Sequence, residues 1–124
     1  MMYKFTIRRI FIRGIHMKIS NLKYKLEKGK SLGADIIYIK EDNLLYGIGD
    51  IYKDENRKNI ILIKSNEESL NIEGFINILD NLLNNLGDID ILIGNDENYK
   101  ESIKDIKNIE FAQYESTKML FINI

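Results

Sequence analysis

Four acidic side chains crowd one short stretch of the chain and are the first candidates for chemistry. The stretch "GDIDILIGNDEN" holds Asp88, Asp90, Asp96 and Glu97. A calcium site needs several oxygen atoms that converge on one point. The calcium-loop pattern D-x-[DN]-x-[DN]-G fails here because Leu92 stands in its fifth place. We therefore expect acidic residues at strand starts and turns, and no metal site.

The only histidine, His16, is a weak candidate for acid–base chemistry. A catalytic triad needs a nucleophile beside the histidine and an acid that orients the ring. The nearest hydroxyl in the sequence, Ser20, is expected to cap a helix instead. A zinc site normally uses several His or Cys ligands, and the chain has one His and no Cys. We therefore expect no catalytic residues, no metal and no cofactor, and a protein that is not an enzyme.

Two glycine-containing stretches fall short of known phosphate-binding motifs. The stretch "GKS" at 29–31 matches the end of a phosphate loop, but Tyr24 stands where the first glycine of that loop belongs. The stretch "GIGDIY" at 47–52 lacks the third glycine of a dinucleotide-binding fingerprint. Gly47 or Gly49 is expected instead to mark a kink or a bulge in a strand.

Positive charge gathers at the N-terminal end of the chain. Residues 1–30 hold nine Lys or Arg and one acid, whereas the remainder holds nine Lys or Arg and eighteen acids. One explanation is a basic arm that binds nucleic acid. The other is that oppositely charged faces of one fold, or of two copies, attract each other. The candidate residues for binding a partner or nucleic acid are Arg8, Arg9, Arg13, Lys18 and Lys23, with Lys25 and Lys28 nearby.

The composition is typical of a globular protein that lies outside the membrane. The 124 residues are 44% apolar and 30% charged, which favours a single compact domain. The absence of Cys excludes disulfide bonds and fits a reducing cytoplasm. No apolar run approaches the roughly 20 residues that a membrane-spanning helix needs. We therefore expect a cytoplasmic protein with no membrane partner.

The elements that would position these residues come in two similar halves. Ile19 aligns with Ile72 and Leu26 with Leu79 at an offset of 53 residues, and later runs align at offsets of 55 and 59. Insertions at loops after a duplication produce offsets that grow in small steps. Chance similarity in an Ile-rich chain is the alternative. The predicted division is an extension at 1–16, a first unit at 17–66 and a second unit at 67–124.

Each half predicts one helix at its start. Ile19, Leu22 and Leu26 share one helical face because they are three and four residues apart. A longer apolar stripe covers 72–86 in the second half. The expected starts and stops of the helices are Ser20 and Gly29 in the first half, and Asn71 and Gly87 in the second.

Three short Ile-rich runs follow each helix and predict strands. They cover 35–40, 44–52 and 59–64, and then 88–94, 102–114 and 119–124. Short turns between them predict antiparallel neighbours. The expected fold is α+β, with two tandem helix-strand-strand-strand units whose antiparallel sheet or sheets carry both helices on one face. Residues 3–15 form either an additional edge strand or an upstream extension of a chain that starts at Met17.

The repeated unit resembles a kind of small protein, of uncharacterised role, that is found in tailed phages and prophages. The matching residues are "KISNLKYKLEK" with "GADIIYI…GIGDI", and "NIEGFINILDN" with "GDIDILIGNDENYKESIKDI". The similarity covers nearly all of 17–124 as two tandem units. It implies a phage or prophage protein in the cytoplasm of a bacterial host, and it brings no catalytic residues with it.

Two classes of function remain open from the sequence. The first is a non-enzymatic accessory protein that binds a protein partner, with inhibition of a host function as one consequence. Exposed sheet edges would allow a homodimer or the addition of a partner's strand. The second is a protein that binds nucleic acid through the basic residues, or a small anionic nucleotide in a pocket at a repeat or dimer interface.

Overall fold

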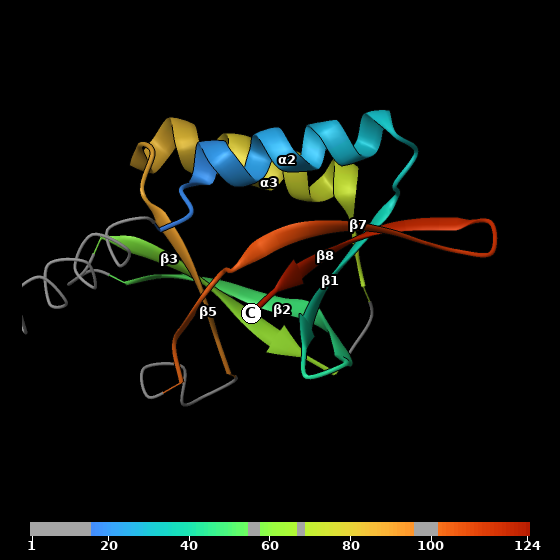
Figure 1. Cartoon of the computed structure of the whole chain (residues 1–124). Coiled ribbons are helices and arrows are strands. Elements are labelled where there is room, and N and C mark those ends of the chain that lie inside the picture. The colour runs from blue at the N-terminus through green and yellow to red at the C-terminus, as the bar shows by residue number, and fades with distance from the viewer. Residues whose placement is uncertain (1–15, 55–57, 67–68, 96–101) are drawn as a thin grey trace, which may run out of the picture.

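A computed structural model describes residues 16–54, 58–66, 69–95 and 102–124. In this structure two helices cover one side of a curled, mixed sheet of eight strands, so the expected α+β class is confirmed (Figure 1). The proposed N-terminal strand and Arg8, Arg9 and Arg13 lie outside the described residues.

The elements of the N-terminal half are one helix and three strands, as expected. Their bounds are α2 Ile19–Ser31, β1 Ile36–Glu41, β2 Leu44–Asp54 and β3 Asn59–Ser65. The C-terminal half holds one helix and more strands than expected. Its elements are β4 Leu70–Asn71, α3 Ile72–Leu86, β5 Asp90–Gly94, β6 Lys104–Asp105, β7 Asn108–Tyr114 and β8 Thr117–Asn123.

The sheet is mixed, so the expected antiparallel sheet is wrong. The strand order is β6-β5-β3-β2-β1-β8-β7, and β4 pairs with the start of β1. Strands joined by short turns pair antiparallel, but β1 lies parallel to β8 and β3 lies parallel to β5. Those two parallel pairs join strands that are far apart in the sequence. Turn sequences carry no information about such pairs.

The run expected as one strand at 102–114 is split into β6 and β7. At its start this segment pairs with β5, and at its end it pairs with β8. Because it pairs with a different strand at each end, the segment runs from one side of the sheet to the other and curls the sheet around the core. A second irregularity is a register shift in β2 between Ile48 and Asp50, which confirms the bulge expected near Gly49.

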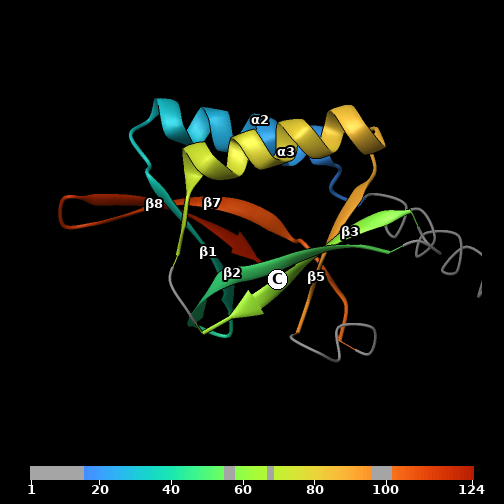
Figure 2. The ribbon, with the colours of Figure 1, turned by 180° about the vertical axis from the view of Figure 1, so that it is seen from behind.

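The core lies between the helices and the concave side of the sheet. Figures 1 and 2 show α2 and α3 side by side on this side, running in opposite directions. Inward-facing Ile and Leu side chains from four strands meet the apolar stripes of both helices. The buried set includes Ile37, Ile39, Ile60, Leu62, Ile91, Ile93, Leu120 and Ile122 from the sheet, and Leu22, Leu26, Phe75 and Leu79 from the helices.

The ends of α3 are those that the sequence predicts, whereas the ends of α2 are not. The Asn71 side chain accepts a hydrogen bond from the Gly74 N–H at 3.0 Å, and Gly87 ends α3 with a φ of 85°. In contrast, α2 begins at Ile19, before Ser20, and continues past Gly29 to Ser31. Gly29 is instead buried against β8.

Candidate functional site

Strands β1 and β8 are apolar on both faces of the sheet. Their inward residues are buried in the core. Four of their outward residues, Ile36, Tyr38, Met119 and Phe121, are also apolar and are half-buried; we call these four residues the outer face. In a sheet that faces water on one side, apolar and polar residues normally alternate. The outer face therefore offers an apolar surface on the side of the sheet opposite the helices.

The outer face is held together by the parallel register of β1 and β8. Ile36 lies beside Met119, and Tyr38 lies beside Phe121, with the two rings 6.4 Å apart and tilted by 53°. The Lys40 ammonium lies 5.1 Å from the centre of the Phe121 ring. These contacts fix the aromatic side chains in place, so little conformational entropy is lost when a partner covers them.

Polar side chains border the outer face at one end. Lys40 Nζ lies 4.0 Å from Glu110 Oε1. The Asn123 amide nitrogen donates to Asn108 Oδ1 at 2.7 Å and to Glu110 Oε1 at 3.0 Å. An apolar centre with a polar border is typical of surfaces that bind other proteins.

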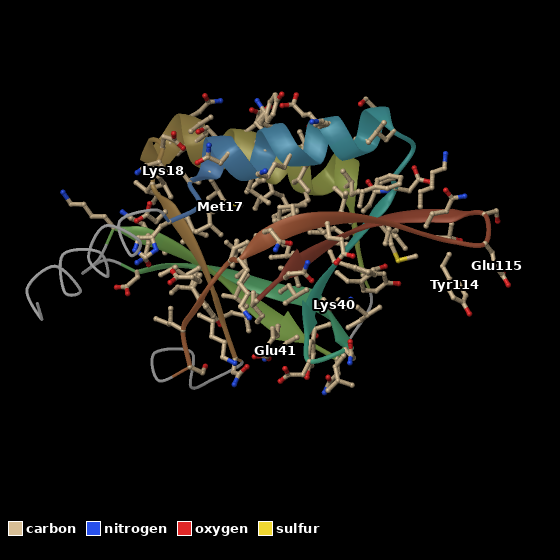
Figure 3. The ribbon with its side chains drawn as sticks, viewed as in Figure 1. Met17, Lys18, Lys40, Glu41, Tyr114 and Glu115 are labelled. Carbon is tan, nitrogen blue, oxygen red and sulfur yellow. The ribbon has the colours of Figure 1, made fainter. Side chains whose placement is uncertain are left out.

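The neighbouring strand β7 is an edge of the sheet. Among the described strands it pairs only with β8. Phe111 is 39% exposed and Tyr114 is 75% exposed. The β7–β8 hairpin extends beyond the body of the fold in Figures 1 and 2, and Figure 3 labels Tyr114 and Glu115 at its tip. Natural edge strands are usually protected by Lys, Pro or bulges, and β7 has none of these.

A cluster of charges lies at the end of the core remote from the helices. Glu41 continues the inward side of β1 and accepts hydrogen bonds from Lys64 of β3 and Lys104 of β6. The bonds from Lys104 and then Lys64 lower the pKa of Glu41, and Glu41 raises the pKa of Lys104. The Lys64 ammonium also lies 4.8 Å from the centre of the Tyr46 ring. The Glu41 carboxylate is shared by both lysines and so joins β1, β3 and β6.

Two of the basic candidates, Lys18 and Lys23, are paired with acids of the C-terminal half. Lys18 Nζ lies 3.4 Å from Asp90 Oδ1, and Lys23 Nζ lies 2.5 Å from Asp80 Oδ1. The hydrogen bond to Asp80 is the main reason that the pKa of Lys23 is raised. Lys18 and Lys23 thus do not form a separate basic patch. Of the explanations for the uneven charge, these pairs favour attraction between two parts of one fold.

Acidic residues of the C-terminal half also connect to the start of the described chain. Asp88 accepts the backbone N–H of Ser20 at 2.8 Å and its hydroxyl at 2.6 Å. These bonds, the hydroxyl first, lower the pKa of Asp88. His16 Nδ1 lies 2.8 Å from Asp105 Oδ1. In the described ranges no three His, Asp or Glu residues lie close enough to hold a metal ion, and Asp96 and Glu97 fall outside those ranges.

Sequence reasoning missed the outer face, although a signal for it was present. The runs "IIYI" in β1 and "MLFI" in β8 are apolar without alternation, which indicates burial on both faces.

Within the described residues, no helix is long and apolar enough to cross a membrane. Comparisons of the chain with known protein families, characterised proteins and solved structures found no match.

Proposed function

We propose that the protein is a non-enzymatic accessory protein that binds a protein partner on the outer face. The observation that carries this proposal is the row of half-exposed apolar side chains on the outward side of β1 and β8. Aromatic residues in such a position dominate the binding energy of many interfaces. The bordering Lys40 and Glu110 supply charges that orient the partner.

The resemblance to tailed-phage and prophage proteins suggests where that partner is found. A phage accessory protein acts in the bacterial cytoplasm on host or phage proteins, and inhibition of a host function is one result of covering a partner's surface. The resemblance alone supports this origin and location.

Nucleic-acid binding has less support. Lys18 and Lys23, two of the described members of the proposed basic patch, are already paired with Asp90 and Asp80. Phosphate contacts by Lys18 and Lys23 would have to compete with these acids. The Glu41 cluster gives the nucleotide alternative little support for the same reason, since both of its lysines are paired.

We also propose that the two halves are tandem copies of one helix-strand-strand-strand unit. The sheet register supports this. Ile36 pairs with Met119, while Ile91, which lies 55 residues after Ile36, pairs with Ile60, which lies 59 residues before Met119. These separations equal the offsets in the sequence alignment. The two parallel pairs thus become equivalent when the halves are exchanged.

Affinity capture from a bacterial lysate with quantitative mass spectrometry tests the protein-binding function. The wild type is compared with the double variant Tyr38→Thr, Phe121→Thr, in which Thr keeps a high strand propensity. Loss of two aromatic anchors, each worth at least about 2 kcal/mol, should reduce the captured partner by more than about tenfold.

The matched control is the double variant Tyr24→Ala, Ile78→Ala. These side chains are exposed on α2 and α3, on the side of the sheet opposite the outer face. The control should capture the partner as the wild type does. Equal loss in both variants, or no loss in the outer-face variant, would refute the proposed site.

A further inference from the structure

We infer that two copies of this chain join through β7, with the two strands antiparallel about a two-fold axis at Phe111. The inference goes beyond the proposed function, because it uses the open edge of the sheet and leaves the outer face free. The occupant of the edge is a second copy of the chain.

The first argument is the state of the edge itself. Strand β7 spans seven residues, and all but Ile109 and Ala112 are exposed. Among the described strands β7 pairs only with β8, and unpaired N–H and C=O groups along an edge form a template for another strand. The strand contains no Lys, Arg or Pro, and its pairing with β8 runs through seven consecutive residues without a bulge. Lys, Pro and a bulge, three of the features that normally prevent edge-to-edge pairing, are therefore missing from β7.

The second argument is that β7 is complementary to itself. In an antiparallel pair centred on Phe111, Phe111 faces Phe111 of the partner subunit, and Ile109 faces Gln113 of the partner subunit. The only charged residue of the strand, Glu110, then faces Ala112 of the partner subunit. Like charges directly opposite each other destabilise a strand pair, and this register avoids them. Opposed aromatic side chains at the centre stabilise it.

The third argument is continuity with the outer face. Pairing β7 with its copy creates the strand order β1-β8-β7-β7-β8-β1, so the two outer faces become parts of one sheet surface. A single strand pair lies at the small end of specific interfaces, which typically bury about 1,200–2,000 Å² in total. We therefore expect a dimer that dissociates at micromolar concentrations.

Single-cysteine variants test the register, because the natural chain contains no Cys. In the Phe111→Cys variant, two directly opposed residues have Cα atoms about 4.5–5.5 Å apart, which lies within the range of about 4.4–6.8 Å that a disulfide bond spans. Mild oxidation should convert most of this variant to a covalent dimer. In the Tyr114→Cys variant, the thiols are offset by six residues, or roughly 20 Å, and should not react with each other.

The Tyr114→Cys control is decisive because Tyr114 is more exposed than Phe111. Random collision would cross-link the more exposed thiol faster, whereas the proposed dimer cross-links Phe111→Cys at least tenfold faster. Equal rates, or faster reaction at Tyr114→Cys, would overturn the inference. Circular dichroism checks that both variants are folded.

Sedimentation velocity of the wild-type protein gives an independent readout. The wild type should form a dimer at about 0.1–1 mM, Phe111→Lys should be a monomer, and Leu44→Lys should remain a dimer. A wild type that is monomeric throughout this range would overturn the inference.

The partner-capture experiment is unaffected by that result, so failure of the dimer and failure of the outer-face function are distinguishable. A third outcome is a monomeric wild type that captures another protein, with the capture abolished by Phe111→Lys. That outcome would assign the edge to a strand of another protein, and it would also overturn the dimer.

Discussion

At the scale of single residues, charged side chains in this protein connect parts of the chain that are distant in sequence. Lys18 meets Asp90, Lys23 meets Asp80, and Lys30 lies 3.5 Å from Glu73. Most of these pairs are exposed and each adds little to stability. Glu41 is the exception, because the side chains of Glu41 and Lys64 are almost buried. Water cannot solvate either charge fully, so removal of one partner leaves the other charge uncompensated.

The variant Glu41→Gln tests that difference. It leaves Lys64, whose side chain is only 12% exposed, without a full counter-charge. The free energy of unfolding at pH 7 should fall by about 1–3 kcal/mol. Because the folded-state pKa of Glu41 is lowered, its contribution is complete above the ordinary value of 4.5 and is lost as the pH falls through the folded-state pKa.

Urea unfolding at pH 7 and at about pH 3 measures the effect of Glu41→Gln. The wild type and the variant should differ at pH 7 and approach each other in acid. Glu115→Gln, at the exposed tip of the β7–β8 hairpin, is the control and should match the wild type at pH 7. A Glu41→Gln deficit of the same size at both pH values would contradict the assigned role of the carboxylate.

At the scale of elements, α2 is held in place by a cap from the C-terminal half and by close packing against the sheet. Asp88, which precedes β5, satisfies the backbone N–H of Ser20 in the first turn of α2. Gly29 lets α2 approach β8, since a Cβ at this position would lie 2.6 Å from Leu120 Cδ1 and 2.9 Å from its Cγ. The position of α2 on the sheet therefore depends on a missing side chain.

The variant Gly29→Ala should destabilise the protein by about 1–3 kcal/mol through overpacking against buried Leu120. Helix propensity alone predicts the opposite, a gain of about 1 kcal/mol. The control is Gly74→Ala in α3, where the nearest atom to an added Cβ is 3.9 Å away. Thermal or urea unfolding should show the control to be neutral or stabilised. Stabilisation of both variants would show that α2 does not need this close approach.

At the scale of the whole molecule, neither half can complete its own sheet. Strand β1 pairs with β4 and β8, and β3 pairs with β5, so both parallel pairings cross between the halves. Each helix also covers strands of both halves, since the buried residues form one shared core. The two halves of the chain therefore stabilise each other.

Separated fragments 17–66 and 67–124 should be largely unfolded, because each loses its parallel strand partners and half of the shared core. Circular dichroism of each fragment alone, and of an equimolar mixture, measures this. Helix and sheet signals should return on mixing, since the two fragments carry complementary charges and strand edges. A fragment 17–66 that folds cooperatively alone would contradict the shared core.

Sequence periodicity predicts local features of this protein well. The apolar stripes locate both helices, and Asn71, Gly87 and the bulge near Gly49 lie where the turn and cap chemistry places them. These features are local, since each depends on side chains within about one turn or one strand of each other. The candidate site was only hinted at by the unbroken apolar runs of β1 and β8.

The sequence by itself determined the α+β class, the places of two helices and most strands, and the uneven distribution of charge. The tertiary structure alone decided the parallel pairs β1–β8 and β3–β5, the acid that each lysine meets, and the faces left open to a partner. The physical reason is range: helix periods and turns act between near neighbours, whereas strand order and surface exposure depend on which distant segments bury each other first.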